Sequence, residues 1–255
     1  MTNLAPESGL LARVPPRLVR IASVVVVVLA WEIAGRAAPR WASYPTEVAA
    51  AFMDNLDRII DAFIETFKAV GVGYAISVAG GVLIGFGMAR IRVVKVALDP
   101  YVAVLYSTPR ITLIPLAILL IGIGFNLRVL MSVLASIFPM IINTYAAVDS
   151  VSAELEETAR SFTASRWSIT RTVLIPGAIP GIFVGMRVGI IRALVGVIVA
   201  EMTAGAAGVG ALLLVFGRFF QSEKLFGPVL LLGFMSILMT RGLSLLERKL
   251  APWQD

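Results

Sequence analysis

Long apolar runs recur along the whole chain, and they restrict its fold more than any other feature of the sequence. Several approach or exceed the roughly 18–20 residues that a helix needs to cross a bilayer. Hydrocarbon offers no partner to a backbone N–H or C=O group, so such segments must be helices or strands of a closed barrel. The runs do not alternate, and Gly, Ala and Ser are scattered among Val, Leu and Ile, which is typical of packed membrane helices. We predict an all-α integral membrane protein with about six transmembrane helices.

Three absences narrow the chemistry. The chain has no Cys and no His, which removes thiolate nucleophiles, imidazole bases and the usual zinc and haem ligands. It also has no Gly-x-x-x-x-Gly-Lys-Ser/Thr phosphate loop, so it cannot bind ATP in the P-loop manner. The net charge of +6 is explained by Lys and Arg on cytoplasmic loops rather than by nucleic acid. We predict no catalytic residue and no metal site.

Polar breaks between the apolar runs give the expected organisation. Residues 1–17 are predicted to be a flexible cytoplasmic tail, 18–61 the first span and an external interfacial helix over 45–60, and 250–255 a second tail. Residues 62–249 form the predicted core of five spans, with a polar segment over 149–172. The predicted spans are 18–38, 62–89, 98–124, 129–148, 173–202 and 225–246. Pro109 and Pro115 should kink or break the third.

The basic residues predict the orientation of these spans. With both termini in the cytoplasm, eleven Lys and Arg side chains face inward: Arg13, Arg17, Arg20, Arg90, Arg92, Lys95, Arg160, Arg166, Arg171, Arg248 and Lys249. Six face outward: Arg36, Arg40, Arg58, Arg128, Arg218 and Lys224. This bias favours two cytoplasmic termini. We find no internal repeat, so a two-fold pore would need a second copy of the chain.

The segment 149–172 has the pattern of an amphipathic cytoplasmic helix. Ser152 is a good N-cap, and Ser165 can start a second short turn. The first turns hold three acids, which the helix dipole favours there: Glu154, Glu156 and Glu157. One face carries an apolar series at helical spacing: Leu155, Ala159 and Phe162. Taken alone, such a helix could equally lie on the bilayer surface or cap the bundle.

The order of residues in this segment is more specific. Glu157-Thr158-Ala159 is followed four residues later by Thr163, and then by Val173-Leu174-Ile175-Pro176. This resembles the EAA loop of binding-protein-dependent ABC importer permeases of the type I fold. Thr158 stands for the first alanine of that pattern and Thr163 for its glycine. A threonine is strained in a left-handed turn, so we expect the local turn to be reshaped.

The resemblance covers essentially the whole chain after the tail, and it is closest to the nitrate, sulfonate and taurine branch. The segments that carry it are Ser43-Tyr44-Pro45-Thr46-Glu47-Val48, Pro109-Arg110 with Pro115-Leu116, Phe138-Pro139 with Asn143-Thr144, Ala159-Arg160-Ser161, Gly185-Met186-Arg187, Ala200-Glu201 before Gly208-Val209-Gly210, and Leu245-Leu246-Glu247-Arg248.

The resemblance implies a permease subunit of the bacterial cytoplasmic (inner) membrane, importing a small solute with sulfonate, nitrate or taurine-like anions as candidates. It implies four partners: a dimer of ATP-binding subunits that holds ATP and Mg, a second permease copy, a periplasmic or lipid-anchored solute-binding protein, and lipid. No cofactor is expected in this chain. The expected coupling residues are Leu155, Glu156, Glu157, Thr158, Ala159, Arg160, Phe162, Thr163 and Arg166. Of these, Leu155, Ala159 and Phe162 would form the packing face, with Glu157, Arg160 and Arg166 as its polar rim.

Polar groups inside the spans are the candidates for a translocation pathway, because ionisable groups in a membrane usually face a cavity or a partner. The tentative set is Arg110, Asn143, Arg187, Arg192 and Glu201. An excess of arginine suits an anion, although Arg110, Arg187 and Glu201 could be structural pairs and Asn143 a packing hydrogen bond. Arg187 and Glu201 lie about 21 Å apart on a straight helix, so each needs another partner, for example in a second copy. Lys68 and Arg241 can snorkel.

Two other classes stay open at this point. A secondary transporter or channel independent of ATP would need inverted repeats or its own gate, and co-purification with an ATPase would exclude it. A membrane-embedded enzyme would have to rely on Asp, Glu, Ser or Lys, and turnover of a substrate without ATP would reveal it.

Overall fold

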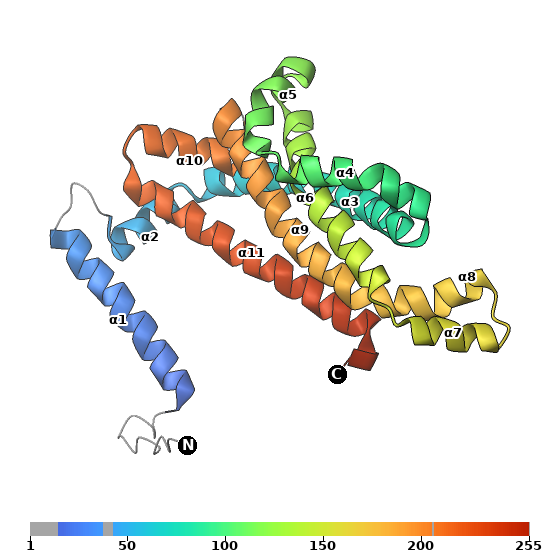
Figure 1. Cartoon of the computed structure of the whole chain (residues 1–255). Helices are drawn as coiled ribbons and strands as arrows, with labels where there is room; N and C mark the ends of the chain where they lie inside the picture. Colours follow the sequence, from blue (N-terminus) through green and yellow to red (C-terminus); the bar gives the residue numbers. More distant parts are fainter. Residues whose placement is uncertain (1–14, 38–42, 206, 255) are drawn as a thin grey trace, which may run out of the picture.

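The computed structural model describes residues 15–37, 43–205 and 207–254, and Figure 1 shows that they form helices joined by short connections. No strand occurs among these residues, which confirms the all-α prediction. Five helices are long and apolar enough to cross a membrane, and a bent pair makes a sixth span. The five are α1 Pro16–Ala37, α3 Leu56–Arg90, α6 Phe125–Asp149, α9 Ile175–Ala204 and α11 Ser222–Leu250. The predicted tail 1–17 lies largely outside the described residues.

Helix α6 lies between α3 and α9 and packs on both. Glycines make this packing close: a methyl group on Gly85 of α3 would lie 2.6 Å from the carbonyl oxygen of Ile141. On the other side of α6, a methyl group on Gly196 of α9 would lie 2.7 Å from the carbonyl oxygen of Met131. The glycines of the second and fifth predicted spans therefore act as small residues that let neighbouring backbones approach.

The third span is broken, as predicted. Helix α4 (Arg92–Ser107) and the pair η2 (Arg110–Leu113) and α5 (Ile114–Ile121) meet at an angle of 93°. The break falls at Pro109, which cannot donate a backbone hydrogen bond. The prediction of a polar connection between the second span and residue 98 is wrong. Only Ile91 separates α3 from α4, so the residues after it form the first turns of α4.

Two further boundaries differ from the prediction. The interfacial helix expected over 45–60 ends early, as α2 (Pro45–Asp54), because the Asn55 side chain bonds back to the Ala51 carbonyl at 2.8 Å and the chain turns. Its last predicted turn belongs to α3, so the division drawn after residue 61 falls inside a helix. The predicted loop 203–224 contains a helix, α10 (Val209–Arg218).

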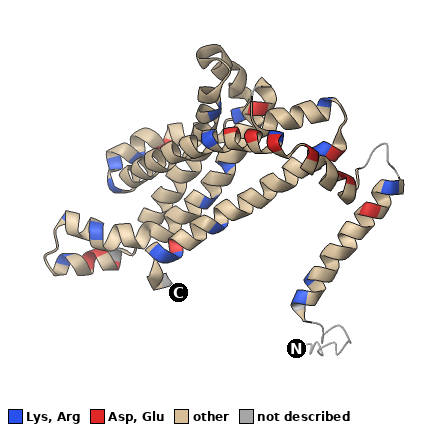
Figure 2. Cartoon of the chain, turned by 180° about the vertical axis from the view of Figure 1, so that it is seen from behind, with Lys and Arg blue, Asp and Glu red and all other residues tan. Residues whose placement is uncertain are grey.

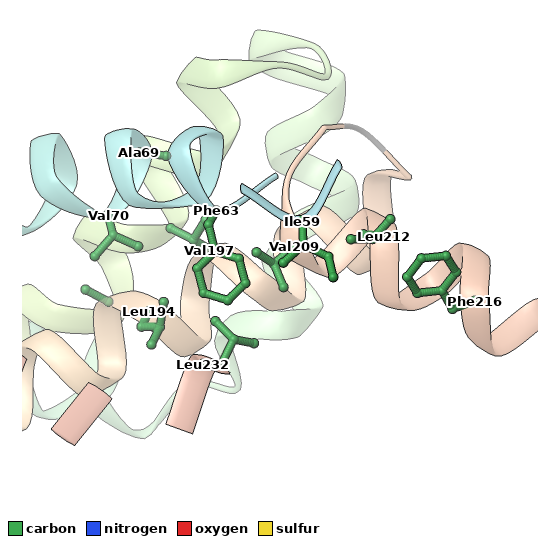
Figure 3. Close-up of a cluster of buried hydrophobic side chains, with 11 residues drawn as sticks. Ile59, Phe63, Ala69, Val70, Leu194, Val197, Val209, Leu212, Phe216 and Leu232 are labelled. Carbon is green, nitrogen blue, oxygen red and sulfur yellow. The ribbon is translucent and has the colours of Figure 1, made fainter. Parts of the chain in front are cut away.

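Helix α10 is held by a buried apolar cluster at this end of the bundle (Figure 3). The cluster combines side chains of α3, α9, α10 and α11: Ile59, Phe63, Ala69, Val70, Ala193, Leu194, Val197, Val209, Leu212, Phe216 and Leu232. Burial of this apolar surface stabilises a helix that is too short to cross a membrane.

Helix α1 stands apart from the other helices (Figure 1). Only 6% of its membrane-length window is buried. Its contacts are near its C-terminal end. The Trp31 indole N–H donates to the Ser43 carbonyl at 2.8 Å, and the Trp31 ring packs against Phe226 in a tilted arrangement with ring centroids 5.1 Å apart. Figure 2 shows that charged residues gather mainly near helix ends and around the segment that connects α6 to α9.

Candidate coupling surface and membrane charge network

The polar segment between α6 and α9 folds as two short helices. Helix α7 spans Ala153–Ser161 and α8 spans Arg166–Ile169, followed by the π-helical turn η3 (Thr170–Leu174) that leads directly into α9. Ser152 takes the predicted N-cap position without a side-chain cap bond, whereas the Ser165 hydroxyl accepts from the Ser168 N–H at 3.2 Å. This pair, called the α7–α8 hairpin below, projects beyond the end of the bundle (Figure 1).

Thr163 forms the turn of the hairpin in the left-handed conformation, with φ of 57°. Its N–H donates to the Arg160 carbonyl at 2.9 Å, and the Ala164 N–H donates to the Ala159 carbonyl at 3.1 Å. These bonds satisfy carbonyls at the end of α7, as a glycine would allow. The expectation of a reshaped turn was therefore wrong: the threonine adopts the glycine-like geometry and bears its strain.

Large apolar side chains are exposed on the hairpin. Leu155 is 55% exposed, Phe162 80% and Trp167 70%, while Ala159 is half-buried between the first two. An exposed apolar surface of this kind usually marks a contact with another protein or with a membrane. Trp167 was missed because it lies on α8, outside the helical series of α7.

An ion pair ties the hairpin to the bundle. Glu156 of α7 accepts from Arg90 at the end of α3 at 2.7 Å, and it lies 3.6 Å from Arg160. Glu156 thus points toward the bundle, whereas Glu157, Arg160 and Arg166 are exposed as predicted for the rim, and so is Thr158. Arg90 was assigned only as a cytoplasmic charge, because nothing in a single sequence pairs residues 66 positions apart.

Glu201 lies at the centre of a buried charge network near the other end of the bundle. Its carboxylate accepts from the Thr66 hydroxyl at 2.9 Å and from the Gly210 N–H at 2.9 Å, and lies 3.5 Å from Arg128. Arg128 also reaches the Glu65 carboxylate at 3.2 Å. Glu201 is completely buried, so it is closed to solute in this structure.

Arg187 and Asn143 also have partners within the chain. Arg187 of α9 forms an ion pair with Glu247 of α11. The Asn143 amide donates to the Pro139 carbonyl at 2.8 Å on its own helix. Arg187 and Glu201 thus have the separate partners that were predicted, and these partners come from other helices of the same chain rather than from a second copy.

Arg110 and Arg192 differ from the other membrane charges. Arg110 begins η2 at the break, and Arg192 lies on α9 with its side chain exposed. Among the residues that the structure describes, no carboxylate lies within 4.0 Å of either guanidinium.

Apolar helices of membrane length, a broken span and a projecting hairpin define a helical membrane transport subunit. Comparisons with known proteins agree. Residues 79–254 match the family described as binding-protein-dependent transport system inner membrane component. The chain belongs to this family and is the permease subunit of an ABC importer.

Relatives that are named for different substrates resemble the chain. It is 35% identical over 166 residues to the riboflavin transport system permease protein RibX of Chloroflexus aurantiacus, covering 65% of this chain and 62% of RibX. It is 29% identical over 184 residues to the putative aliphatic sulfonates transport permease protein SsuC of Bacillus subtilis, covering 72% of this chain and 67% of that protein. The taurine permease protein TauC of Escherichia coli is 29% identical over 173 residues, covering 68% and 63%.

Solved structures share the fold. A crystal structure of an amino acid ABC transporter has a chain with a TM-score of 0.63 at 22% identity, covering 78% of this chain and 97% of that one. An inward-facing structure of the MetNI methionine ABC transporter gives 0.62 at 20% identity over the same shares.

Proposed function

We propose that the chain is the membrane pathway of an importer for a small anionic solute, driven by a separate dimer of ATPase subunits that docks on the α7–α8 hairpin. The observation that carries this proposal is the exposed apolar surface formed by Leu155, Phe162 and Trp167 on a hairpin that projects from the bundle. An aromatic side chain that is 80% exposed is costly in water and well suited to a groove on a partner.

The hairpin can transmit movement because it is continuous with α9 through η3 and is joined to α3 by the Arg90–Glu156 pair. In this proposal ATP and Mg²⁺ are bound by the partner, and nucleotide-driven closure of the partner displaces the hairpin. Both termini of the chain and the hairpin then lie in the cytoplasm, an orientation that the excess of basic residues on that side supports. A second copy completes the pore, and a solute-binding protein delivers the solute from outside.

The solute class rests on two supports. Relatives named for aliphatic sulfonates and for taurine match the chain over more than two thirds of its length. In addition, Arg110 and Arg192 supply positive charge within the membrane without a neighbouring carboxylate.

The docking surface is tested by Phe162→Asp and Glu157→Lys in the full complex. We expect both variants to insert in the membrane, to lose ATPase subunits on purification, and to lose transport-coupled ATP hydrolysis. Phe220→Asp is the matched control, because Phe220 is 90% exposed but lies in the turn before α11, at the far end from the hairpin. Normal co-purification and coupled hydrolysis in both hairpin variants would show that the ATPase binds elsewhere.

A further inference from the structure

Five polar residues are candidates for the pathway, and the structure separates two of them from the rest. Glu201, Arg187 and Asn143 use their polar atoms within the chain. The two that remain, Arg110 and Arg192, have no carboxylate partner among the described residues.

Arg110 is held in place by its neighbours, while its guanidinium keeps a hydrogen-bond donor without an acceptor among the described residues. Its Nη2 donates to the Tyr106 carbonyl at 3.2 Å, and its guanidinium carbon lies 5.5 Å from the centre of the Tyr106 ring and 5.9 Å from that of Phe138. The Nε atom is buried and has no hydrogen-bond partner among the described residues. A guanidinium has five N–H donors, so this side chain retains donors for a ligand.

Arg192 lies on α9 and is exposed. It lies 17 residues after Ile175 and 12 before Ala204, close to the middle of a helix about 45 Å long. The segment η2 contacts α9, and Arg110 lies over the Phe138 ring of α6. Gly189 and Gly196 of α9 pack on Met140 and Ala135 of α6, so Arg192 and Phe138 lie at the same level of the two packed helices. Two like charges near the middle of a membrane span repel each other and are poorly solvated by lipid, so an anion between them would stabilise both.

The backbone at this place is also unusual for a membrane. Between Ser107 and Arg110 the chain is not helical, and non-helical backbone at membrane depth is tolerated where it is buried in protein or lines a water-filled cavity. A shallow hollow lies beside the break, lined by Ala103, Val104, Ser107, Thr108 and Pro109. The broken span thus places Arg110 directly after a hollow whose lining includes the hydroxyl residues Ser107 and Thr108.

We propose that Arg110 and Arg192 form an anion-binding station of the pathway, which takes a small oxyanion such as a sulfonate or nitrate. The planar guanidinium matches two oxygens of such a group through parallel N–H donors. The proposal rests on the function proposed above and assigns the charge of the solute to two specific side chains.

The chain contains no cysteine, which permits a direct test. Thr108→Cys places one thiol in the hollow of the assembled complex, purified with its partner subunits and reconstituted in liposomes. The reaction rate of this thiol is measured with an anionic reagent, sulfonatoethyl methanethiosulfonate, and with a cationic one, trimethylammonioethyl methanethiosulfonate. We expect the anionic-to-cationic rate ratio to exceed that of free 2-mercaptoethanol by about tenfold or more, because two positive charges lie nearby.

Substitutions in the same background assign the effect. Arg110→Gln and Arg192→Gln should each lower the ratio several-fold, Arg110→Lys and Arg192→Lys should keep it high, and Arg241→Gln on α11 is the control that should leave it unchanged. Ethanesulfonate or nitrate at millimolar concentration should slow labelling in the parent and not in the double Gln variant.

Three results would overturn the proposal: a thiol that reacts with neither reagent, a ratio equal to that of 2-mercaptoethanol or unaffected by both Gln variants, or no protection by either anion. None of these readouts depends on ATPase docking. A failed hairpin test would therefore remove the coupling proposal and leave the anion station in place. A failed labelling test would remove the anion station, together with the support that Arg110 and Arg192 give to an anionic solute, and leave the coupling proposal in place.

Discussion

The Glu201–Arg128 pair offers the sharpest test of how the bundle is stabilised. Glu201→Ala removes the acceptor of two neutral donors, the Thr66 hydroxyl and the Gly210 N–H. It also removes one of the two carboxylates that contact the buried Arg128, at 3.5 Å. Breaking a buried ion pair by removing one partner costs about 3–5 kcal/mol. Because Arg128 keeps Glu65 at 3.2 Å, we expect the lower end, about 3 kcal/mol of the free energy of unfolding.

Arg128→Met should cost about as much, since it leaves the Glu201 carboxylate buried with neutral donors only. The double variant removes both charges, so neither is left buried without its partner. Its loss of unfolding free energy should be about 3 kcal/mol rather than the sum of the two single losses, which corresponds to a coupling energy of about 3 kcal/mol between Glu201 and Arg128. The assay is equilibrium unfolding of the purified chain in mixed micelles by stepwise addition of SDS, followed by helical circular dichroism.

The control is Asp54→Ala, an exposed acid at the end of α2, which should change the free energy of unfolding by less than about 0.5 kcal/mol. Single losses below about 1 kcal/mol, or losses of Glu201→Ala and Arg128→Met that add within about 0.5 kcal/mol, would refute the reasoning.

Two further predictions concern the hairpin. Thr163→Gly should raise the free energy of unfolding by about 0.5–1 kcal/mol in the same titration, because glycine adopts a positive φ without strain. Thr158→Gly in α7 should lower it by about 0.3 kcal/mol, and a loss of stability at Thr163 would contradict the reasoning. Arg90→Glu should lower transport-coupled ATP hydrolysis about fivefold by opposing Glu156, and adding Glu156→Arg should restore it; a double variant no better than the single would show that the pair transmits nothing.

Much of the helical architecture was predictable because it depends on local sequence. The length of each apolar run gives a span, and Pro109 gives the break in the third. Helix α10 was missed because its ten residues are too short to signal a span, and its stability comes from burial against α3, α9 and α11. The end of α2 was misplaced because no proline or glycine marks Asn55.

The candidate site divides in the same way. The hairpin was predictable from the acids of its first turn and from the spacing of Leu155 and Phe162. The partners of the membrane charges were not, because Arg128 and Glu201 are 73 positions apart and meet only when α6 packs on α9. Arg128 was counted as an outward-facing basic residue, and its burial could not be inferred from a single sequence.

The close glycine contacts among α3, α6 and α9 have a mechanical consequence. The backbone of α6 is in close contact with α3 at Gly85 and with α9 at Gly196. Close-packed interiors have low compressibility, so we expect these three helices to behave as one rigid unit. If a partner displaces the hairpin, which connects α6 to α9, we expect the three helices to move together. The regular helical backbone is interrupted at the 93° bend by Pro109 and after α9, where Gly205 and Gly208 each have positive φ.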